Sequence, residues 1–379
     1  MNKRVSLYLC YAAITLFAMV LTINSPLLSD ISATLHLSLA QSGVLFTANF
    51  TGFVCFIMIG GILADRISKK TVLSTSIGGL AISILLFPLT ANIYISCAIM
   101  VLIGGFGGII ESIISAVVAE LYPEKAVFYI NMSQVFFGIG ALVGPITAGI
   151  VVSLGTSWQM CYYVLGILLL FLTVAFIANK LPLSPQNEKI TWKGFVNLIS
   201  DPRFLLICIC MFLYTGSEVG GWGWLSTFLK KNLDFSPLSS SIAVGLFWLA
   251  MTLGRFLFGS LTGKFSTRHL VITLSFTSAI VTFFLGVSSN PYTIWILILL
   301  MGFAYSSLWP LIVAYGDSQY DKPKGTIFAL LVGCGGVGAA IVPFLLGMIA
   351  QITNIHFAII SPVVLLFILG LIFWRFDHS

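Results

Sequence analysis

The sequence predicts an all-α membrane protein with twelve transmembrane helices arranged as two pseudo-symmetric six-helix bundles. Three observations support this: the composition, the number of long apolar runs, and the likeness of the two halves. Of the 379 residues, 59% are hydrophobic and 8% are charged, whereas a soluble domain carries about 25% charged residues. Because so apolar a chain cannot cover its surface with polar groups, we expect lipid to surround it.

A crossing helix needs about 20 mostly apolar residues, and the sequence contains twelve such runs. The first run follows Met1–Arg4 and is longer than the core of a signal peptide, so it is predicted to be an uncleaved span. The twelve predicted spans are residues 5–29, 41–64, 71–90, 93–118, 128–153, 158–179, 204–229, 238–263, 269–288, 292–315, 325–350 and 354–375.

The basic residues predict the orientation, because Lys and Arg stay on the cytoplasmic side of a membrane. With the N-terminus inside, all eighteen basic residues except Lys230 and Lys231 lie at cytoplasmic ends or in cytoplasmic loops. The sequence therefore predicts a multi-pass protein of the cytoplasmic (inner) membrane with both termini cytoplasmic. The bases are divided among short loops and form no stripe, which excludes nucleic acid as a partner.

The longest predicted cytoplasmic link divides the spans six and six. It predicts an N-terminal bundle at 1–179, a linker at 180–203 and a C-terminal bundle at 204–379. Part of the linker is predicted to form a helix on the membrane surface. Four of its apolar residues have helical spacing: Trp192, Phe195, Val196 and Ile199.

The two halves carry similar marks at matching positions. Spans two and eight end in glycine and basic residues, at 60–70 and 259–268, and spans five and eleven carry glycine runs that end in Pro145 and Pro343. Internal repeats of this kind are typical of secondary transporters, whose substrate site lies between the repeats near the middle of the membrane.

The segment Gly60-Gly-Ile-Leu-Ala-Asp-Arg-Ile-Ser-Lys-Lys70 resembles the loop signature of the major facilitator superfamily. It departs from that signature at Ser68, where glycine is usual, and the second copy has Gly263 in place of the aspartate. The resemblance covers essentially the whole chain. It implies alternating access, with gating contacts at Gly61, Asp65 and Arg66.

Two carboxylates lie inside predicted spans, Glu111 in span four and Glu218 near the middle of span seven. A charge near the centre of a membrane helix costs about 2.5–3.5 kcal/mol on insertion scales, so we expect each to have a task. Each is predicted to carry protons, bind the substrate or balance a cation. The alternative is a protonated carboxyl that hydrogen-bonds to a neighbouring helix. Arg255, toward the cytoplasmic end of span eight, is interpreted as a gate or anchor residue.

Spans four and five resemble the fucose permease group of the superfamily. Glu111 matches a glutamate that this group ties to proton coupling and sugar binding, and Asn131 and Gln134 match its Asn-Leu-x-Gln pattern. Departures occur at Ser115 and Phe137, and the span-one aspartate of the group is missing. The resemblance implies a sugar:proton symporter, with a site more apolar than that of the group.

Span seven contains the unusual stretch GSEVGGWGW. Tyr214, Glu218 and Trp222 are spaced four apart and share one helix face, so they are predicted to contact substrate. The four glycines at 216, 220, 221 and 223 predict either a hinge or close helix packing, and the alternative for Trp222 or Trp224 is an interfacial belt residue. Four further candidates for cavity lining, or for hydrogen bonds between helices, are Asn24, Asn49, Tyr305 and Trp309.

The sequence predicts no enzyme, cofactor or metal site. Its glycine clusters follow no strand, so they are not nucleotide-binding loops, and its four histidines are scattered. The favoured function is proton-coupled symport of a sugar or sugar-like solute, for which a monomer suffices. The alternative is an efflux antiporter for an amphipathic compound, based on Gly140, Gly144, Pro145 and Gly149, and a lipid flippase ranks below both.

Overall fold

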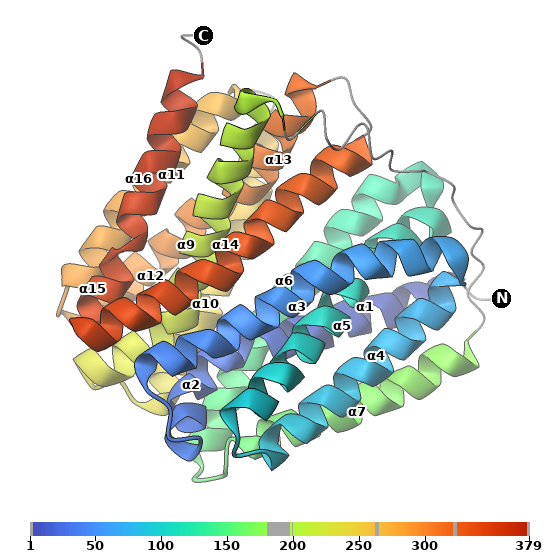
Figure 1. The fold of residues 1–379 in the computed structure, drawn as a ribbon, viewed down its shortest axis with the longest axis horizontal. Helices are drawn as coiled ribbons and strands as arrows, with labels where there is room; N and C mark the ends of the chain where they lie inside the picture. Colours follow the sequence, from blue (N-terminus) through green and yellow to red (C-terminus); the bar gives the residue numbers. More distant parts are fainter. Residues whose placement is uncertain (1–2, 180–197, 199, 262–264, 321–323, 377–379) are drawn as a thin grey trace. The chain divides into compact units, whose positions relative to one another are not determined.

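The computed structural model describes residues 3–179, 198, 200–261, 265–320 and 324–376. The side chains of residues 58, 61–62, 64–66, 127, 259–261 and 324–326 also lie outside the described set. The predicted surface helix at 192–199 lies almost wholly outside it. Every regular element within the described residues is a helix (Figure 1).

Twelve helical stretches in the described residues are long and apolar enough to cross a membrane, which confirms the predicted number. The helices of the first half are α1 (Lys3–Thr22), α2 (Asn24–Thr34), α3 (Leu39–Arg66), α4 (Lys69–Leu86), η1 (Phe87–Leu89), α5 (Ile93–Leu121), η2 (Pro123–Lys125), α6 (Ala126–Ser153) and α7 (Gln159–Ala178). Those of the second half are α9 (Pro202–Leu233), α10 (Pro237–Leu261), α11 (Thr267–Val287), α12 (Pro291–Tyr305), α13 (Leu308–Gln319), α14 (Lys324–Ile352), α15 (Ile355–Ile360) and α16 (Pro362–Arg375).

Three predicted spans are broken where the sequence analysis expected continuous helices. The first span breaks at Ile23, the tenth at Ser306–Ser307 and the last at Ser361. A proline follows each break within a few residues: Pro26, Pro310 and Pro362. Proline has no N–H, so it cannot complete the hydrogen bond to the carbonyl four residues before it.

Matching residues cap matching helices in the two halves. Ser68 begins α4 and Ser266 begins α11, each by accepting a backbone N–H with its hydroxyl oxygen. Asn92 begins α5 and Asn290 begins α12, each with two such bonds from the first turn. The caps satisfy N–H groups that have no partner within a helix. They lie at the same spacing in both halves and extend the internal repeat seen in the sequence.

The chain forms two compact units. The first unit comprises Met1–Leu37, Val44–Asn187 and Ser236–Gly245, and the second comprises Ser38–Gly43, Glu188–Phe235 and Leu246–Ser379. These units follow the two halves of the sequence, except that the first residues of α3 and α10 are exchanged.

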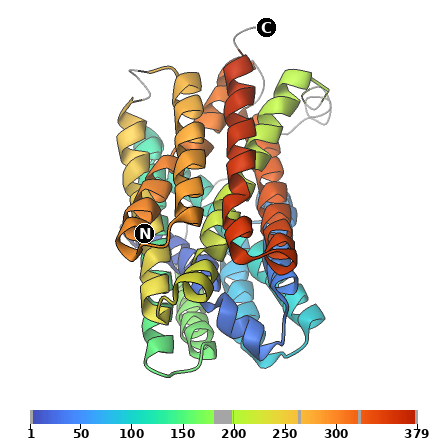
Figure 2. The ribbon, with the colours of Figure 1, turned by 90° about the vertical axis from the view of Figure 1, so that its left-hand side faces the viewer.

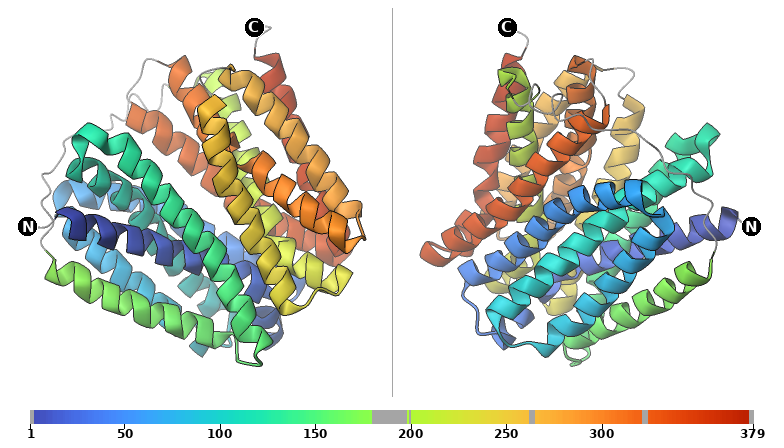
Figure 3. Two further views of the ribbon diagram at one scale, coloured as in Figure 1. Left: turned by 180° about the vertical axis from the view of Figure 1, so that it is seen from behind. Right: turned by 45° about the vertical axis from the view of Figure 1, so that its right-hand side comes forward.

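Equivalent helices pack together within each unit. In the first unit α1 packs on α6, and α4 packs on both α5 and α7; α4 and α7 run side by side in both views of Figure 3. In the second unit α9 packs on α14, and α11 packs on both α12 and α16; Figure 2 shows α11 beside α16. The pairing of first with fifth and third with sixth spans is therefore the same in each half.

Glycines let equivalent helices touch at equivalent places. A methyl group at Gly104 of α5 would overlap the carbonyl oxygen of Asn49 in α3. A methyl group at Gly302 of α12 would likewise overlap the carbonyl oxygen of Phe247 in α10. Small residues at such crossings allow close van der Waals packing between membrane helices. The first contact positions Asn49, and the second brings α10 against the break between α12 and α13.

Candidate functional site

Glu218 lies near the middle of α9, the longest helix, with 7% of its surface exposed. Its carboxyl group lies beside the hydroxyl of Tyr214, one turn earlier on the same face, and interacts with it electrostatically. Trp222, one turn later, packs on Trp248 of α10 with ring centroids 5.8 Å apart. The four-residue spacing thus places all three predicted side chains in the second unit, on the side of α9 that meets α10 and α12.

The hydroxyl of Tyr214 faces two acceptors. It donates to the carbonyl oxygen of Tyr305 at 3.1 Å, and it also interacts electrostatically with the carboxyl group of Glu218. A tyrosine hydroxyl has one hydrogen to donate, but its oxygen can also accept. An unbroken chain therefore forms when Glu218 is protonated, since its O–H can donate to Tyr214 while Tyr214 donates to Tyr305.

The ring of Tyr305 closes the other side of this network. The hydroxyl groups of Tyr305 and Thr282 of α11 are 3.2 Å apart, and both side chains are fully buried. The rings of Tyr214 and Tyr305 lie 6.3 Å apart. Four helices, α9, α10, α11 and α12, thus contribute polar groups to one site.

The break between α12 and α13 provides a carbonyl for Arg255. In a regular helix the Ser306 carbonyl would accept from the residue four later, but that residue is Pro310, which has no N–H. The Nε of Arg255 donates to this carbonyl at 3.2 Å. A methyl group at the preceding Gly254 would overlap the side chain of Ser306. Proline and glycine together therefore bring the arginine to the break.

Arg255 and Glu218 interact electrostatically, but no salt bridge within 4.0 Å joins Arg255 to an acid in the described part of the chain. Arg255 is half-exposed, whereas Glu218 is buried. Ser306 lies near the middle of the span Pro291–Gln319, so the arginine side chain reaches this depth of the span. Its predicted role as a gate or anchor residue remains a proposal.

Two glycines of α9 pack closely against α14, and the two tryptophans of this helix are buried. The helix runs unbroken through the glycines. Methyl groups at Gly216 and Gly220 would collide with Val342 and Leu346 of α14, so these two glycines allow close helix packing, the second of the two predicted roles. Trp222 has 1% of its surface exposed. Trp224 is fully buried, and its indole donates to the carbonyl of Pro343 at 2.9 Å. The interfacial-belt alternative is therefore wrong for both tryptophans.

In the first unit, Asn24 lies directly after the break in the first span. Its amide nitrogen donates to the carbonyls of Val20 and Leu21 at 3.3 and 3.1 Å. Its amide oxygen accepts from the hydroxyl of Tyr162 of α7 at 2.7 Å. Pro26 explains the break because it cannot donate to the carbonyl of Thr22. Asn24 is therefore oriented by three hydrogen bonds.

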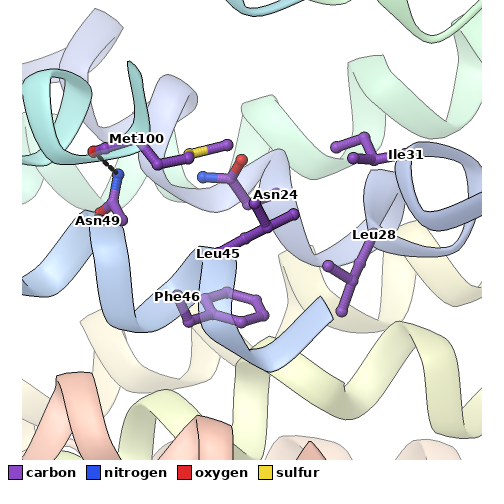
Figure 4. A pocket seen from close by; sticks show the side chains of 7 residues that line it. All are labelled: Asn24, Leu28, Ile31, Leu45, Phe46, Asn49 and Met100. Atoms are coloured by element: carbon purple, nitrogen blue, oxygen red, sulfur yellow. Dashed lines mark hydrogen bonds between the residues drawn. The ribbon is translucent and has the colours of Figure 1, made fainter. Parts of the chain in front are cut away.

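A small pocket lies beside Asn24 (Figure 4). Asn49 of α3 points toward Met100 of α5, and its amide nitrogen donates to the Met100 carbonyl at 3.5 Å. The pocket has room for one water molecule and not for a sugar. Its lining residues are Asn24, Leu28, Ile31, Leu45, Phe46, Asn49 and Met100.

The residues that carry the resemblance to the fucose permease group lie apart from this pocket. Glu111 of α5 and Gln134 of α6 are half-exposed, and Asn131 of α6 is exposed. None of the three lines the pocket beside Asn24. Phe137, by contrast, is buried and packs on Phe17 of α1 with ring centroids 6.2 Å apart.

The predicted gating motif ends α3, and its side chains at Gly61, Asp65 and Arg66 lie outside the described residues. Just beyond it, Lys69 at the start of α4 forms a salt bridge with Glu120 near the end of α5. Trp309 of α13 is half-exposed and packs edge-on against Phe328 of α14, with centroids 5.8 Å apart.

At the start of α9, outside the spans, Asp201 caps the helix. Its carboxylate accepts from the backbone N–H of Arg203 at 2.8 Å. That bond, together with one from the Tyr320 hydroxyl, holds the pKa of Asp201 below its ordinary value. Burial, followed by the bond to Asp201, raises the pKa of Tyr320. The start of α9 is thereby joined to the end of α13.

The sequence analysis missed three groups that the structure brings into the site. Tyr162 orients Asn24, the Ser306 carbonyl binds Arg255, and Thr282 contacts Tyr305. Pro310 is a sequence signal for the free Ser306 carbonyl, because a proline inside an apolar span leaves the carbonyl four residues earlier without its N–H donor. The other two are contacts between helices far apart in the sequence, and no local pattern indicates them.

A family model described as Major Facilitator Superfamily matches the chain twice, over residues 10–222 and 207–379. The Protein TsgA homolog of Buchnera aphidicola subsp. Baizongia pistaciae is 24% identical over 377 residues, which cover 95% of this chain and 94% of the relative. The Protein TsgA homolog of Yersinia pestis (strain Pestoides F) is 20% identical over 353 residues, covering 93% and 90%.

Solved structures share the fold. The nucleoside transporter NupG superposes with a TM-score of 0.84 at 15% identity, covering 98% of this chain and 99% of that one. A bacterial homolog of the human lysosomal transporter Spinster gives 0.84 at 14% identity, covering 99% and 96%. The Escherichia coli fucose:proton symporter FucP gives 0.68 at 16% identity, covering 99% of each chain.

Proposed function

This chain belongs to the Major Facilitator Superfamily, and we propose that it carries a small organic solute across the cytoplasmic membrane in symport with protons. Alternating access would move the solute between the bundles at 1–179 and 204–379. Glu218 is the proposed proton site in the second unit, and Glu111 is a second carboxyl on the proton path. The distribution of basic residues supports cytoplasmic termini.

The arrangement around the Tyr214 hydroxyl is the observation that carries the proton assignment. Its hydrogen is donated to the Tyr305 carbonyl at 3.1 Å, and its oxygen interacts with the neighbouring Glu218 carboxyl group. A protonated Glu218 completes the chain of hydrogen bonds, whereas an ionised Glu218 depends on the charge of Arg255. Burial in a low-dielectric site disfavours the ionised form, so the site favours a carboxyl that takes up and releases a proton.

A sugar or sugar-like compound is the solute class that the first unit supports. The exposed Asn131 and half-exposed Gln134 carry amides that hydrogen-bond to hydroxyls, whereas Asn24 and Asn49 would first have to release the hydrogen bonds they make within the unit. FucP, which shares the fold, is a fucose:proton symporter. Stacking on Trp222 would further require the seam between α9 and α10 to open, because the ring is buried here.

The efflux alternative rests on the glycines of α6, and the structure gives these glycines a packing role. Methyl groups at Gly140 and Gly144 would collide with Thr15 and Met19 of α1. This contact serves a symporter and an antiporter equally, so efflux is retained as an outcome of the experiment.

The experiment is solute movement in vesicles that contain the purified full-length protein. An inward proton gradient is imposed, and a panel of labelled sugars, other small organic solutes and dyes is followed. We expect solute accumulation along with the protons, and we expect Glu218→Gln to abolish driven accumulation while leaving exchange of solute for solute. Glu111→Gln should also reduce driven accumulation.

Two results would contradict the proposal. Accumulation that is unchanged in both Glu218→Gln and Glu111→Gln would remove the proton assignment. Dye leaving the vesicles against the entering protons would identify an antiporter instead. A variant that does not fold is recognised by its elution from a sizing column, and Gly333→Ala is a matched control because a methyl group there has no atom within 4 Å.

A further inference from the structure

We propose that Arg255 binds a carboxylate group on the transported solute, and that Glu218 competes with this carboxylate for the arginine. The inference rests on the proposed function and makes it more specific: the cargo is a small organic anion, such as a sugar acid or hydroxy acid. The site lies wholly within the second unit, formed by α9, α10 and the break between α12 and α13.

Among the described residues, no hydrogen bond uses the two terminal nitrogens of Arg255, which form its anion-binding edge. Its Nε is held by the Ser306 carbonyl at 3.2 Å, which fixes the guanidinium plane. No acid lies within 4.0 Å of it among the described residues. The two terminal nitrogens form a fork that matches a carboxylate bidentately, and the side chain is not buried.

A purely structural anchor explains this arrangement less well. A charge within a span is costly and usually marks a substrate or ion pathway. One hydrogen bond to a carbonyl needs only a neutral donor such as glutamine. Arg268 shows what an anchoring arginine does in this unit, because its Nε and one terminal nitrogen donate to carbonyls at the end of α16, at 2.9 and 2.6 Å.

Glu218 determines whether the charge on Arg255 is balanced from within the protein. The ionisable groups facing Glu218 are Tyr214 on its own helix, Arg255 on α10 and Tyr305 on α12, with the polar Thr282 behind Tyr305 on α11. The part of α14 against this stretch of α9 presents Gly338, Val342 and Leu346.

When Glu218 is ionised, its charge balances Arg255 and repels an anion. When Glu218 is protonated, it is satisfied through Tyr214, and Arg255 is left with an unbalanced positive charge. Proton and anion therefore favour each other's binding, and by linkage the effect is reciprocal. Symport follows from this coupling, because the empty site and the site holding both ligands carry the same charge.

The charge carried per cycle separates this inference from neutral sugar symport. A proton moving with a monovalent carboxylate carries no net charge, whereas a proton moving with a neutral sugar carries one. The membrane potential acts on net charge, at about 2.3 kcal/mol per charge per 100 mV. Uptake of the carboxylate should thus respond to a pH gradient and not to a potassium diffusion potential.

Binding to the purified full-length protein in detergent tests the site directly. The probes are matched pairs of a carboxylate and its amide, glucuronate with glucuronamide and lactate with lactamide, followed by competition and by thermal stabilisation. We expect the carboxylates to bind, more tightly at mildly acidic than at mildly alkaline pH, and the amides to bind weakly at both.

Three variants sharpen the test. Arg255→Gln should weaken carboxylate binding at least about thirtyfold, and Arg255→Lys should recover part of it because the charge remains without the fork. Glu218→Gln should bind carboxylates at both pH values, because the competing charge is gone. Arg268→Gln is the matched control, and it should keep wild-type affinity.

Equal affinity of Arg255→Gln and wild type for the carboxylates, or equal binding of acids and amides, would overturn the inference. These results differ from a failure of the proposed function. Proton-driven uptake of neutral sugars without carboxylate binding would leave symport standing and remove the anion site. Carboxylate binding through Arg255 without proton-driven uptake would leave the anion site standing and remove symport.

Discussion

The two units use the same architecture for different chemistry. In the first unit the helix break before Pro26 is surrounded by neutral groups: Asn24 is bonded to Tyr162 and two carbonyls. In the second unit the break before Pro310 is contacted by Arg255, which interacts electrostatically with Glu218. Packing, caps and glycine contacts repeat between the units, whereas these polar residues do not.

This difference separates what holds a bundle together from what the bundle does. Repeated features keep helices in register, and they are apolar or backbone-directed. The groups that differ have charges or amides at membrane depth, where an unneeded polar group is costly. We therefore infer that the helix break of the second unit handles charge, whereas the break of the first unit is held by neutral hydrogen bonds.

The largest effect on stability is expected from substitutions of Gly104 and Gly302, which occupy equivalent positions in the two units. Gly104→Ala and Gly302→Ala each place a methyl group on a backbone carbonyl of the crossing helix. Overpacking of this kind costs about 1–3 kcal/mol or more, so both variants should lose several degrees in the thermal unfolding midpoint.

Gly333→Ala is the control, because a methyl group there meets no atom within 4 Å, and it should be unchanged or slightly more stable. Loss of stability at Gly302 alone, with Gly104→Ala unaffected, would show that the two helix crossings are not equivalent.

A smaller and more specific effect is expected from removing one hydroxyl in each unit. Tyr214→Phe leaves the Tyr305 carbonyl without its donor, at about 1–3 kcal/mol. It also removes the hydroxyl beside Glu218, so it should shift the pH dependence of uptake. Tyr162→Phe leaves the Asn24 oxygen without its partner and should raise the KM with the pH profile unchanged.

Uptake rates across a pH series check both variants. If Tyr162→Phe shifts the pH profile while Tyr214→Phe raises only the KM, the proposed difference in chemistry between the two units is wrong.

Much of the fold follows from local sequence, and much of the site does not. Apolar runs of sufficient length predicted all twelve spans, and four-residue spacing predicted the shared face of Tyr214, Glu218 and Trp222. The approach of Arg255 to Ser306 depends on how α10 rotates against α12, which a long-range glycine contact fixes. Sequence periodicity carries no information about that rotation. The interaction of Arg255 with Glu218 was therefore not predicted.

The helix breaks could be predicted from the sequence only in part. Pro26, Pro310 and Pro362 were visible in the sequence, but proline inside a span does not by itself break a helix, as Pro145 in α6 and Pro343 in α14 demonstrate. At the break before Pro310 a neighbouring helix supplies a donor for the freed carbonyl. Arg255 does so at Ser306, and such a partner is known only once the helices are packed.

Proton uptake on solute binding tests the central claim most directly. Unbuffered protein in detergent, with a pH indicator, is mixed with a solute that binds, for wild type and for Glu218→Gln at equal occupancy. The account predicts that wild type takes up protons from solution and that Glu218→Gln takes up none. Equal uptake by both proteins would place the proton elsewhere and contradict the assignment of Glu218.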